Sequence, residues 1–395
     1  MTEGLTDRPL RILTVTTSYP RSSGDFSGHF VHALAAALVS RGHQVTVLAP
    51  HAKGLAPEEE CDGVRVVRFR YAPAMLERVA YGAGIPTNLK RDLLAVLALP
   101  AFAAGLRAAV RAHAGEADVV HVNWAPTAAL AGRALAGSRA VLTLHGSDAT
   151  LARSGGGMWR RLLVAGLARA TRVVVVATEQ ATFLRGSGLL AASPSVIPSG
   201  VAPALLERAE TTAEHEGFEF LFAGRLVPEK GVKELLDAFA RMARTHPDAR
   251  LTLMGSGPEE DALRERVQAG ALGEVVQFLG AVPHAEALDA IESADAFVLP
   301  SHAEGSPLSV TEALALGTPV IATRVGALPE LLGAAGLIVE KNDVAGLARA
   351  MVRVMEDRGL VEQLVREGRE RIAARYTWPA VALAYERVFA EALDG

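Results

Sequence analysis

Two glutamates, Glu304 and Glu312, stand eight residues apart in the segment "EGSPLSVTEALALGTPVIAT" of residues 304–323. A Gly-Ser-Pro loop separates Glu304 from a predicted helix that carries Glu312, with Ser309 as its predicted N-cap. Carboxylates accept hydrogen bonds from sugar hydroxyls, and the amides of a helix start bind anions. The pattern therefore fits a hydroxyl-rich or anionic ligand. The same spacing is also compatible with a helix-start charge at Glu312 and a solvated loop residue at Glu304.

A second segment, "AGRLVPEKG", places two basic residues just beyond a predicted strand. Arg225 follows the strand, and Lys230 immediately precedes Gly231 and the helical pattern "VKELLDAFARMA". A guanidinium and an ammonium beside a helix start make a good site for a diphosphate. An ordinary loop with solvated basic residues fits the same sequence.

The segment "LMGSGPEEDAL" offers Gly255-x-Gly257 between a predicted strand and a predicted helix. It fails as a dinucleotide fingerprint, because Glu260 occupies the position of the third glycine. Pro258 and the acidic residues after it are also ordinary for a helix start. The glycines would still let the backbone approach a base or a ribose closely.

The N-terminal half has its own candidates. In "VLTLHGSD", His145 ends a predicted strand, where it can donate to a developing charge or bond to a neighbouring carbonyl. The loop "SYPRSSGDFSGHF" runs into a helix with Gly28 near its start, which predicts another amide-lined anion site. Three other histidines are predicted to be structural or solvated: His29, His32 and His121.

The elements that must position these residues are short apolar runs alternating with helical patterns. Runs such as "RILTVTT", "DVVHVNW" and "AVLTLHG" are continuous and apolar, which indicates parallel strands covered on both faces. The alternation stops in a polar, glutamate-rich stretch, predicted to be a linker over residues 201–216, and restarts at "FEFLFAG". We therefore predict an α/β protein with two doubly wound Rossmann-like domains, residues 1–200 and 217–377, facing across a cleft where strand C-termini meet ligands. A final helix over residues 378–395 could pack on either domain, including back on the N-terminal one.

Composition limits the cellular setting. The chain has 395 residues, of which half are hydrophobic and few are aromatic. Its single cysteine, Cys61, rules out an intrachain disulfide and fits a reducing compartment. No basic-then-apolar leader is predicted, so we expect a cytoplasmic protein. Residues 1–200 carry a net charge of +8 and the remainder −12. The basic half is expected to meet an anionic partner, although solvated charge explains it as well, and no pattern predicts nucleic-acid binding.

The most apolar run is "LLAVLALPAFAAGLRAAV", residues 93–110. Its length approaches that of a membrane span, but Pro100 and Arg107 interrupt it, so we predict an amphipathic surface helix. Basic residues flank or punctuate it, which would suit peripheral association with the inner face of an anionic membrane: Arg78, Lys90, Arg91, Arg107 and Arg111. A helix buried in the N-terminal domain is the alternative.

Taken together, these motifs resemble retaining glycosyltransferase family 4, which has the GT-B fold. The resemblance covers nearly the whole chain, and its most specific element is Glu304-x7-Glu312, joined in the family's order by "LHGSD", "AGRLVPEKG", "MGSG" and "FLGAV". It implies that Glu312 holds the donor ribose and Glu304 the donor sugar. It further implies that Arg225 and Lys230 hold the diphosphate, and that His145 lies beside the anomeric carbon.

The implied site is larger than these residues. The catalytic positions correspond to His145, Glu304, Arg225 and Lys230. The donor-binding positions correspond to Gly28, Gly224, Arg225, Lys230, Gly255, Gly280, Val282, Glu304, Gly305, Ser306, Pro307, Leu308 and Glu312. Trp124 and Asp148 are expected to contact the acceptor.

The chain departs from the family at two places. The family often has a Gly-Gly pair where this chain has Ser27-Gly28, which puts acceptor or phosphate contacts in doubt. The common Pro-Asn-Gly-Val-Asp reads Pro-Ser-Gly-Val-Ala over residues 198–202, a change expected to leave the donor site intact.

The resemblance implies a retaining hexosyltransferase that uses a nucleoside diphosphate sugar as substrate. UDP is the commonest donor nucleotide in the family, so a UDP-sugar is expected, with an acceptor hydroxyl in surface polysaccharide, glycolipid or natural-product biosynthesis. No cofactor is expected, and no metal either, because a metal-binding Asp-x-Asp is absent. The alternatives are a sugar-nucleotide epimerase and a non-catalytic nucleotide-sugar-binding relative. A glycogen or starch synthase is a third, although its N-terminal Lys-x-Gly-Gly is missing.

Overall fold

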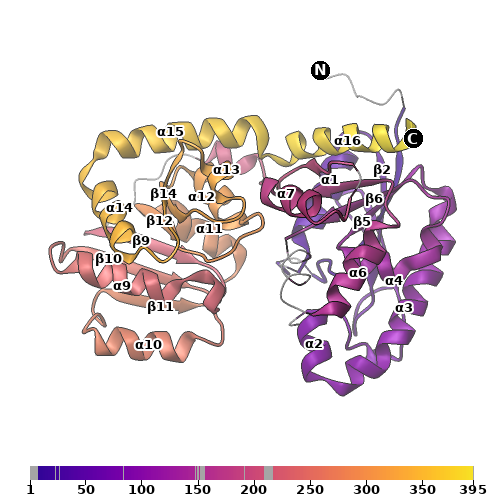
Figure 1. The fold of residues 1–395 in the computed structure, drawn as a ribbon, viewed down its shortest axis with the longest axis horizontal. Helices are drawn as coiled ribbons and strands as arrows, with labels where there is room; N and C mark the ends of the chain where they lie inside the picture. The colour runs from indigo at the N-terminus through magenta and orange to yellow at the C-terminus, as the bar shows by residue number, and fades with distance from the viewer. Residues whose placement is uncertain are drawn as a thin grey trace. The chain divides into compact units, whose positions relative to one another are not determined.

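The chain forms two compact units, which we describe separately. The first is Met1–Pro198 with Trp378–Gly395, and the second is Ser199–Thr377. In this computed structural model, the strands of each unit are flanked by helices (Figure 1). The structure describes residues 8–22, 24–25, 27–82, 84–146, 148, 151, 156–190, 192–208 and 217–394.

The first unit contains an eight-stranded sheet of order β3-β4-β2-β1-β5-β6-β7-β8. All neighbouring strands are parallel except the edge pair β3 and β4. Every residue of β5 and β6 is buried, which is why their sequences are mostly apolar. The strands are β1 (Arg11–Val15), β2 (Gln44–Pro50), β3 (Glu58–Cys61), β4 (Val64–Phe69), β5 (Val119–Asn123), β6 (Ala140–Leu144), β7 (Arg172–Val175) and β8 (Ser195–Val196).

Helices cover both faces of this sheet. Alternate residues of β1 belong to different cores: Ile12 packs with α1 and α16, and Leu13 packs with α3, α4, α6 and α7. The helices are α1 (His29–Ser40), α2 (Ile85–Arg91), α3 (Leu93–His113), α4 (Ala125–Ala131), α6 (Gly157–Leu167), α7 (Thr178–Gly186) and α16 (Trp378–Asp394). Single 3₁₀ turns occur at η1 (Ala74–Leu76), η2 (Ala114–Glu116) and η3 (Gly132–Leu135).

The C-terminal helix α16 is part of the first unit, although it follows the whole second unit in sequence. Its apolar face, which includes Val381 and Phe389, is buried against α1 and the sheet. Tyr385 Oη lies 3.0 Å from Thr143 Oγ1. The buried carboxylate of Glu386 accepts hydrogen bonds from the Arg41 guanidinium and lies 2.9 Å from His43 Nε2. Of the two packings that the sequence allowed, the helix therefore adopts the one on the N-terminal unit.

The second unit contains a six-stranded, all-parallel sheet of order β11-β10-β9-β12-β13-β14. The chain starts near the middle at β9 and winds outward in both directions, which is the doubly wound topology predicted from the sequence. The strands are β9 (Phe218–Ala223), β10 (Ala249–Met254), β11 (Val276–Gly280), β12 (Ala296–Leu299), β13 (Val320–Thr323) and β14 (Gly336–Val339).

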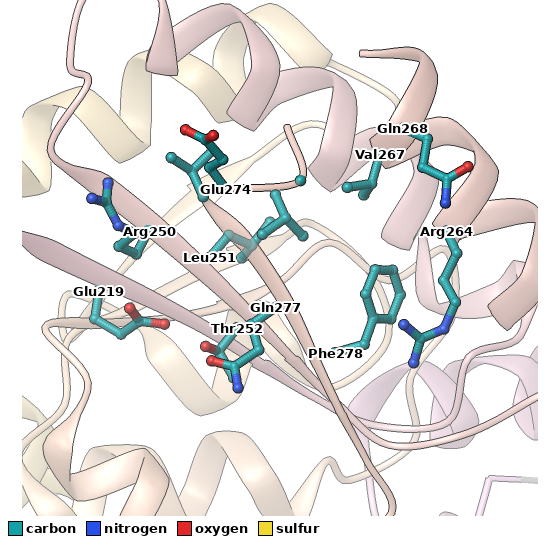
Figure 2. A pocket seen from close by; sticks show the side chains of 13 residues that line it. Glu219, Arg250, Leu251, Thr252, Arg264, Val267, Gln268, Glu274, Gln277 and Phe278 are labelled. Atoms are coloured by element: carbon teal, nitrogen blue, oxygen red, sulfur yellow. The ribbon is translucent and has the colours of Figure 1, made fainter. Parts of the chain in front are cut away.

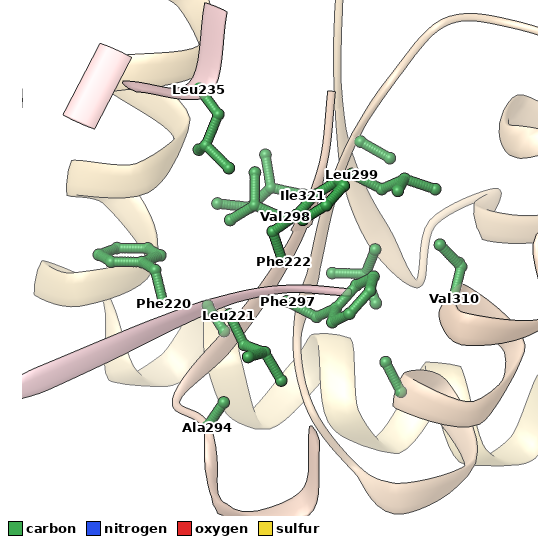
Figure 3. Close-up of a cluster of buried hydrophobic side chains, with 14 of the residues drawn as sticks. Phe220, Leu221, Phe222, Leu235, Ala294, Phe297, Val298, Leu299, Val310 and Ile321 are labelled. Carbon is green, nitrogen blue, oxygen red and sulfur yellow. The ribbon is translucent and has the colours of Figure 1, made fainter. Parts of the chain in front are cut away.

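The core of the second unit is built on β9 and β12. Phe220, Phe222 and Phe297 are fully buried among aliphatic side chains (Figure 3). The surrounding helices are α8 (Ala204–Glu207), α9 (Val232–Ala243), α10 (Glu260–Ala269), α11 (His284–Ser293), α12 (Leu308–Leu316), α13 (Leu328–Leu332), α14 (Val344–Glu356) and α15 (Arg358–Arg375), with the 3₁₀ turn η4 (Pro228–Lys230).

The predicted linker is shorter than residues 201–216. Val201 forms a parallel bridge with Thr377, and Leu205 is buried in the core of the second unit. The turn α8 between them therefore belongs to that unit. The prediction of a longer linker rested on polar composition. Two apolar residues, Val201 and Leu205, are nevertheless enough to dock this short segment on the second unit. Residues 209–216 lie outside the described residues.

Helix α3 differs along its length. Its C-terminal half is core, since Phe102, Leu106 and Val110 are fully buried. Its N-terminal half is apolar and exposed, with Leu93 at 73% and Leu97 at 67% of full exposure. Within the described residues, the segment Leu93–Glu116 is the one helix long and apolar enough to cross a membrane by length and composition, a test that core helices also pass. The predicted surface helix and the predicted buried helix are thus the two halves of one element.

Candidate active site

In the second unit, the loops after three neighbouring strands lie side by side. The Gly224 amide, after β9, donates to the carbonyl of Met254 at 2.9 Å. The Gly255 amide, after β10, donates to the carbonyl of Gly280 at 2.7 Å. Parallel strands end at the same edge of a sheet, so three glycines from distant motifs meet there.

The glycines of the β10 loop have a packing reason. Gly255 has φ +128°, and a Cβ on it would lie 1.9 Å from the carbonyl oxygen of Gly224. A Cβ on Gly257 would lie 2.2 Å from the carbonyl oxygen of Leu226. These glycines were predicted to approach a ligand. In the structure they let the β10 loop pack against the β9 loop. The β9 loop contains Arg225, which therefore lies at the same edge of the sheet.

Lys230 and Glu304 are paired. Lys230 Nζ donates to Glu304 Oε1 at 2.5 Å, and the two side chains are 20% and 8% exposed. Lys230 ends η4, and Gly231 then starts α9 with φ +65°. A Cβ on Gly231 would lie 2.1 Å from the carbonyl oxygen of Pro300, so only glycine lets α9 start this close to the end of β12. Arg225, also predicted here, has an exposed side chain.

Two residues that the sequence interpretation missed support Glu304. Ser301 Oγ donates to Glu304 Oε1 at 2.5 Å. Gly326 follows β13 with φ +54°, and a Cβ on it would lie 1.9 Å from the carbonyl oxygen of Glu304. Ser301 comes directly after the apolar run "AFVLP", and Gly326 follows "PVIAT" in "RVG", so each could have been suspected from its place after a strand.

The loop from Glu304 to Leu308 leads into α12. The N-cap of α12 is Pro307 and not Ser309, and no side chain caps the helix. Proline cannot continue the helix backwards and has no polar side chain, so the amides of the first turn lack a side-chain acceptor. This first turn, with Gly305 and Ser306 before it, suits an anion better than a serine-capped helix would.

The Pro-Ser-Gly-Val-Ala segment does contact the predicted donor loop. The Ser199 amide donates to Ser306 Oγ at 3.2 Å. The departure from the family at this segment was expected to leave the donor site intact, and this stays a prediction. The contact uses a backbone amide, which serine supplies as well as the family's asparagine does.

Glu312 is held by a histidine that the sequence interpretation missed. The Glu312 side chain is 9% exposed, and its Oε1 lies 2.8 Å from His284 Nε2 at the start of α11. The hydrogen bond to Glu312 is the main cause that raises the pKa of His284. The sequence offered a clue to this role, because His284 lies two residues after Val282, the last residue of the quoted "FLGAV" motif.

In the first unit, His145 follows β6 and belongs to a buried network. His145 Nε2 lies 2.8 Å from Asn123 Oδ1 at the end of β5. The centroid of the ring also lies 4.8 Å from that of Phe30, in the first turn of α1, and the two rings are tilted by 54°. Burial lowers the pKa of His145 to about 4, so the imidazole is neutral at pH 7.

Asp148 organises the backbone around His145. Its Oδ2 accepts the His145 amide at 2.9 Å, and its Oδ1 accepts the Ala125 amide at 2.7 Å. Burial raises the pKa of Asp148 to about 6. Both carboxylate oxygens are engaged with main-chain donors. Asp148 was predicted to contact the acceptor, and this stays a prediction; in the structure its two oxygens accept from the amides of Ala125 and His145.

Trp124 and Gly28 have unusual backbones. Trp124 has φ +76°, which is strained for a bulky residue, and its buried Nε1 has no hydrogen-bond partner within the described part of the chain. Gly28 has φ +68°, and a Cβ on it would lie 2.2 Å from the carbonyl oxygen of Ser18. Gly28 is the N-cap of α1, and no side chain caps that helix.

A separate pocket in the second unit contains none of the predicted residues. It has a volume of about 690 Å³ and lies between β10, β11 and α10 (Figure 2). Phe278 and Arg264 stand together on one side of it, with the guanidinium 4.4 Å from the ring centroid. Because its lining comes from the bodies of the strands and not from the glycine loops after them, it is not the candidate active site.

Comparisons with known proteins agree with this organisation. Residues 27–205 match the model for Glycosyltransferase Family 4, and residues 205–371 match the model for Glycosyl transferases group 1. A glycogen synthase of Mycobacterium tuberculosis is 31% identical over 98% of this chain and 96% of its own length. A phosphatidyl-myo-inositol mannosyltransferase of Mycobacterium leprae is 29% identical over 90% of each chain.

Solved structures share the fold. Sucrose-phosphate synthase from Thermosynechococcus elongatus superposes with a TM-score of 0.77 at 24% identity, covering 97% of this chain and 98% of that one. HepE of Anabaena superposes with a TM-score of 0.72 at 20% identity, covering 98% and 99%. Two doubly wound units of this kind make up the GT-B fold. The glycosyltransferase class follows from the two family models and from the relative at 31% identity. The chain belongs to the GT-B glycosyltransferases of family 4 type.

Proposed function

We propose that this glycosyltransferase moves a hexosyl group from a UDP-sugar to an acceptor hydroxyl, with retention of the anomeric configuration and without a catalytic metal. The proposal rests mainly on two carboxylates of the second unit that are each held by a neighbouring side chain. Glu304 accepts a hydrogen bond from Lys230, and Glu312 lies within hydrogen-bonding distance of His284. HepE of Anabaena, which shares the fold, was solved with UDP-glucose, and this supports a nucleotide-sugar donor.

The donor is held in parts by different groups. Arg225, Lys230 and the uncapped amides of α12 neutralise the diphosphate, which is the work of Mg²⁺ in enzymes that have an Asp-x-Asp. Glu312 accepts from the ribose hydroxyls through Oε2, since Oε1 is engaged by His284. Glu304 accepts from the sugar hydroxyls. Backbone contacts come from Gly224, Gly255, Gly280, Val282 and the segment 305–308.

His145 of the first unit assists the sugar as a hydrogen-bonding group. Its pKa of about 4 makes it a poor base at neutral pH, so it is not the residue that removes the acceptor proton. The departing phosphate takes that proton on the face from which the acceptor attacks. Catalysis then rests on positioning and on electrostatic support for an oxocarbenium-like state.

The acceptor is a lipid headgroup at the inner face of a membrane, and the protein is cytoplasmic and peripherally bound. Exposed apolar side chains at the start of α3, with Lys90 and Arg91 just before them, support this choice. A glucan is the second candidate, because the glycogen synthase relative is 31% identical over 98% of this chain. This similarity supports the synthase class, although the Lys-x-Gly-Gly of that class is missing here. Trp124, with its strained backbone and buried indole N–H, is the proposed acceptor contact.

The test is a panel of nucleotide sugars against lipid and glucan acceptors. We expect turnover with a UDP-hexose and a lipid acceptor, an unchanged anomeric configuration by NMR, and unchanged rates after treatment with EDTA. Donor turnover without any acceptor would favour an epimerase. Donor binding without turnover by any acceptor would favour a non-catalytic relative, and transfer to glucan alone would favour the second candidate.

A further inference from the structure

The first unit contains a group of metal-type ligands away from the residues assigned above. Within the part of the chain that the structure describes, one such group is found, and its three ligand atoms lie within 4.8 Å of one another. They are His32 Nε2 on α1, Cys61 Sγ at the end of β3, and Asp62 Oδ2 in the turn that follows. We propose that His32, Cys61 and Asp62 bind a zinc ion.

The spacing of the three atoms is close to that of a zinc site. The distances are 2.8 Å from His32 Nε2 to Asp62 Oδ2, 3.9 Å from His32 Nε2 to Cys61 Sγ, and 3.8 Å from Cys61 Sγ to Asp62 Oδ2. Tetrahedral Zn²⁺ with ordinary bond lengths separates nitrogen from oxygen by about 3.3 Å and sulfur from either by about 3.5 Å. Adjustments of about 0.5 Å at each side chain are enough to admit the ion.

The backbone holds the ligands in place. Cys61 pairs with Val64 across a two-residue Asp-Gly hairpin turn in which both residues have positive φ, +50° and +73°. Such a turn fixes the register of β3 and β4, and with it the position of Asp62. A Cβ on Gly63 would lie 2.9 Å from Val39 Cγ1 of α1, so the turn is pressed against the helix that carries His32.

His32 also has the supporting contact that a metal-binding histidine needs. Its Nδ1 lies 2.6 Å from the hydroxyl of Tyr19, which is buried. The hydroxyl oxygen of Tyr19 can accept a hydrogen bond from Nδ1–H. With the proton on Nδ1, the Nε2 lone pair is available to zinc, and the ring orientation is fixed.

The local charge favours a cation. Strand β3 carries three glutamates before Cys61 and Asp62, and of these four carboxylates two are paired with arginine, Glu58 with Arg65 and Glu59 with Arg68. Zinc binds the thiolate form of cysteine, so its binding would release the thiol proton to solvent. Water would occupy the fourth position.

The proposed ion lies in the first unit, away from the residues assigned to the donor. It would tie the β3–β4 turn to the first turn of α1, the same turn that places Phe30 on the His145 ring. The sequence predicted no metal and a structural or solvated His32. The proposal revises both expectations for this cluster and leaves the metal-independent diphosphate contacts of the proposed function unchanged.

The test is binding of Zn²⁺ and of its spectroscopic substitute Co²⁺ to the purified full chain. We expect saturable binding of one ion per chain by calorimetry and, with Co²⁺, a thiolate charge-transfer band in the near ultraviolet. Cys61→Ser should abolish that band, and Asp62→Asn should weaken binding. Tyr19→Phe keeps all three ligands but should weaken binding roughly 10- to 100-fold, which is typical when a supporting hydrogen bond is lost.

His29→Gln, a change at a neighbouring histidine on the same helix, is the matched control and should bind as the parent does. Cys61 and Asp62 are exposed, so their variants should fold, and an unchanged urea midpoint would verify this. Absence of saturable binding by the parent chain overturns the proposal. Equal affinity of the parent and of Cys61→Ser also overturns it. Neither result would bear on the glycosyltransferase activity, which is measured separately.

Discussion

Lys230 Nζ donates to Glu304 Oε1 at 2.5 Å, with Ser301 Oγ on the same oxygen. The proposed diphosphate ligand and the proposed sugar ligand are therefore paired with each other before any donor binds. The pairing keeps a nearly buried carboxylate satisfied, and the second oxygen of Glu304 remains for the sugar. Loss of Lys230 would thus leave Glu304 without its cation, whereas an amide oxygen at position 304 could still accept a hydrogen bond from Lys230 and hold it in place.

Removing either basic residue should weaken binding of a nucleoside diphosphate much more than binding of the bare nucleoside. For Arg225→Ala and Lys230→Ala the loss should be roughly 1.5–3 kcal/mol each, the value of a charge-assisted contact. Lys230→Ala should also lower stability, because it leaves Glu304 without its cation, whereas Arg225 is exposed. Calorimetry with UDP and uridine measures the difference. Lys233→Ala, an exposed charge change on α9, is the control, and equal losses for both ligands would place the two residues elsewhere.

The two glutamates should separate by role. Glu312→Gln should lower affinity for UDP and for the intact donor alike, since both contain the ribose. Glu304→Gln should leave UDP affinity nearly unchanged and reduce kcat/KM by roughly 10²–10³, as for other single groups that stabilise a transition state. The measurement pairs UDP affinity with turnover for each variant. If Glu304→Gln abolished UDP binding or left turnover intact, the assignment of the sugar to Glu304 and of the ribose to Glu312 would be wrong.

Gly255→Ala should destabilise the second unit by about 2–4 kcal/mol, because backbone strain alone costs roughly 1–3 kcal/mol and the new Cβ meets the Gly224 carbonyl. Gly273→Ala is the control, since nothing lies within 4 Å of the point where its new Cβ would stand. Hydrogen exchange of second-unit amides reports the opening free energy of that unit. Similar exchange in the two variants would mean that the β9 and β10 loops are not in contact.

Acid stability of the first unit should depend on Asp148. Burial lowers the pKa of His145 to about 4 from an unfolded value of 6.5, so stability from this group falls as pH drops from about 6.5 to 4. Burial raises the pKa of Asp148 to about 6 from 3.8, so its contribution changes in the opposite sense and falls as pH rises from about 4 to 6. The two changes offset each other in the parent chain. Asp148→Asn should therefore lose stability more steeply than the parent between pH 6 and 4.

The measurement for Asp148→Asn is urea unfolding at several pH values, followed by tryptophan fluorescence. All three tryptophans lie in the first unit, so the signal reports that unit: Trp124, Trp159 and Trp378. Asp394→Asn, an exposed change on α16, should keep the pH dependence of the parent. A shallower slope in Asp148→Asn than in the parent would show that the carboxylate is ionised throughout this range.

Vesicle binding should depend on the start of α3. The double variant Leu93→Gln with Leu97→Gln should no longer sediment with anionic vesicles at low salt, because it removes the most exposed apolar side chains of that helix. Leu279→Gln, an exposed leucine of the second unit, is the control and should sediment as the parent does. A parent chain that stays entirely in the supernatant would rule out the membrane-bound form.

The order of apolar and polar residues was enough to predict the two sheets and the position of most candidate residues along the chain. Continuous apolar strands alternating with helices permit little besides a parallel, doubly wound sheet. Residues placed just after such strands must then gather at one edge of their own sheet, Arg225 and Glu304 in the second unit and His145 in the first. The family motifs added expected roles, which remain proposals.

Only the tertiary structure shows which side chains pair with each other. Nothing in the spacing of Lys230 and Glu304, 74 residues apart, predicts their contact, and the same holds for His284 with Glu312 and for His32 with Cys61 and Asp62. Such contacts depend on strand order and on loop backbones that pack against one another at glycines. The docking of α16 on the first unit was likewise open, because an apolar helix face shows only that the helix must be covered. Which surface covers it depends on the three-dimensional path of the chain.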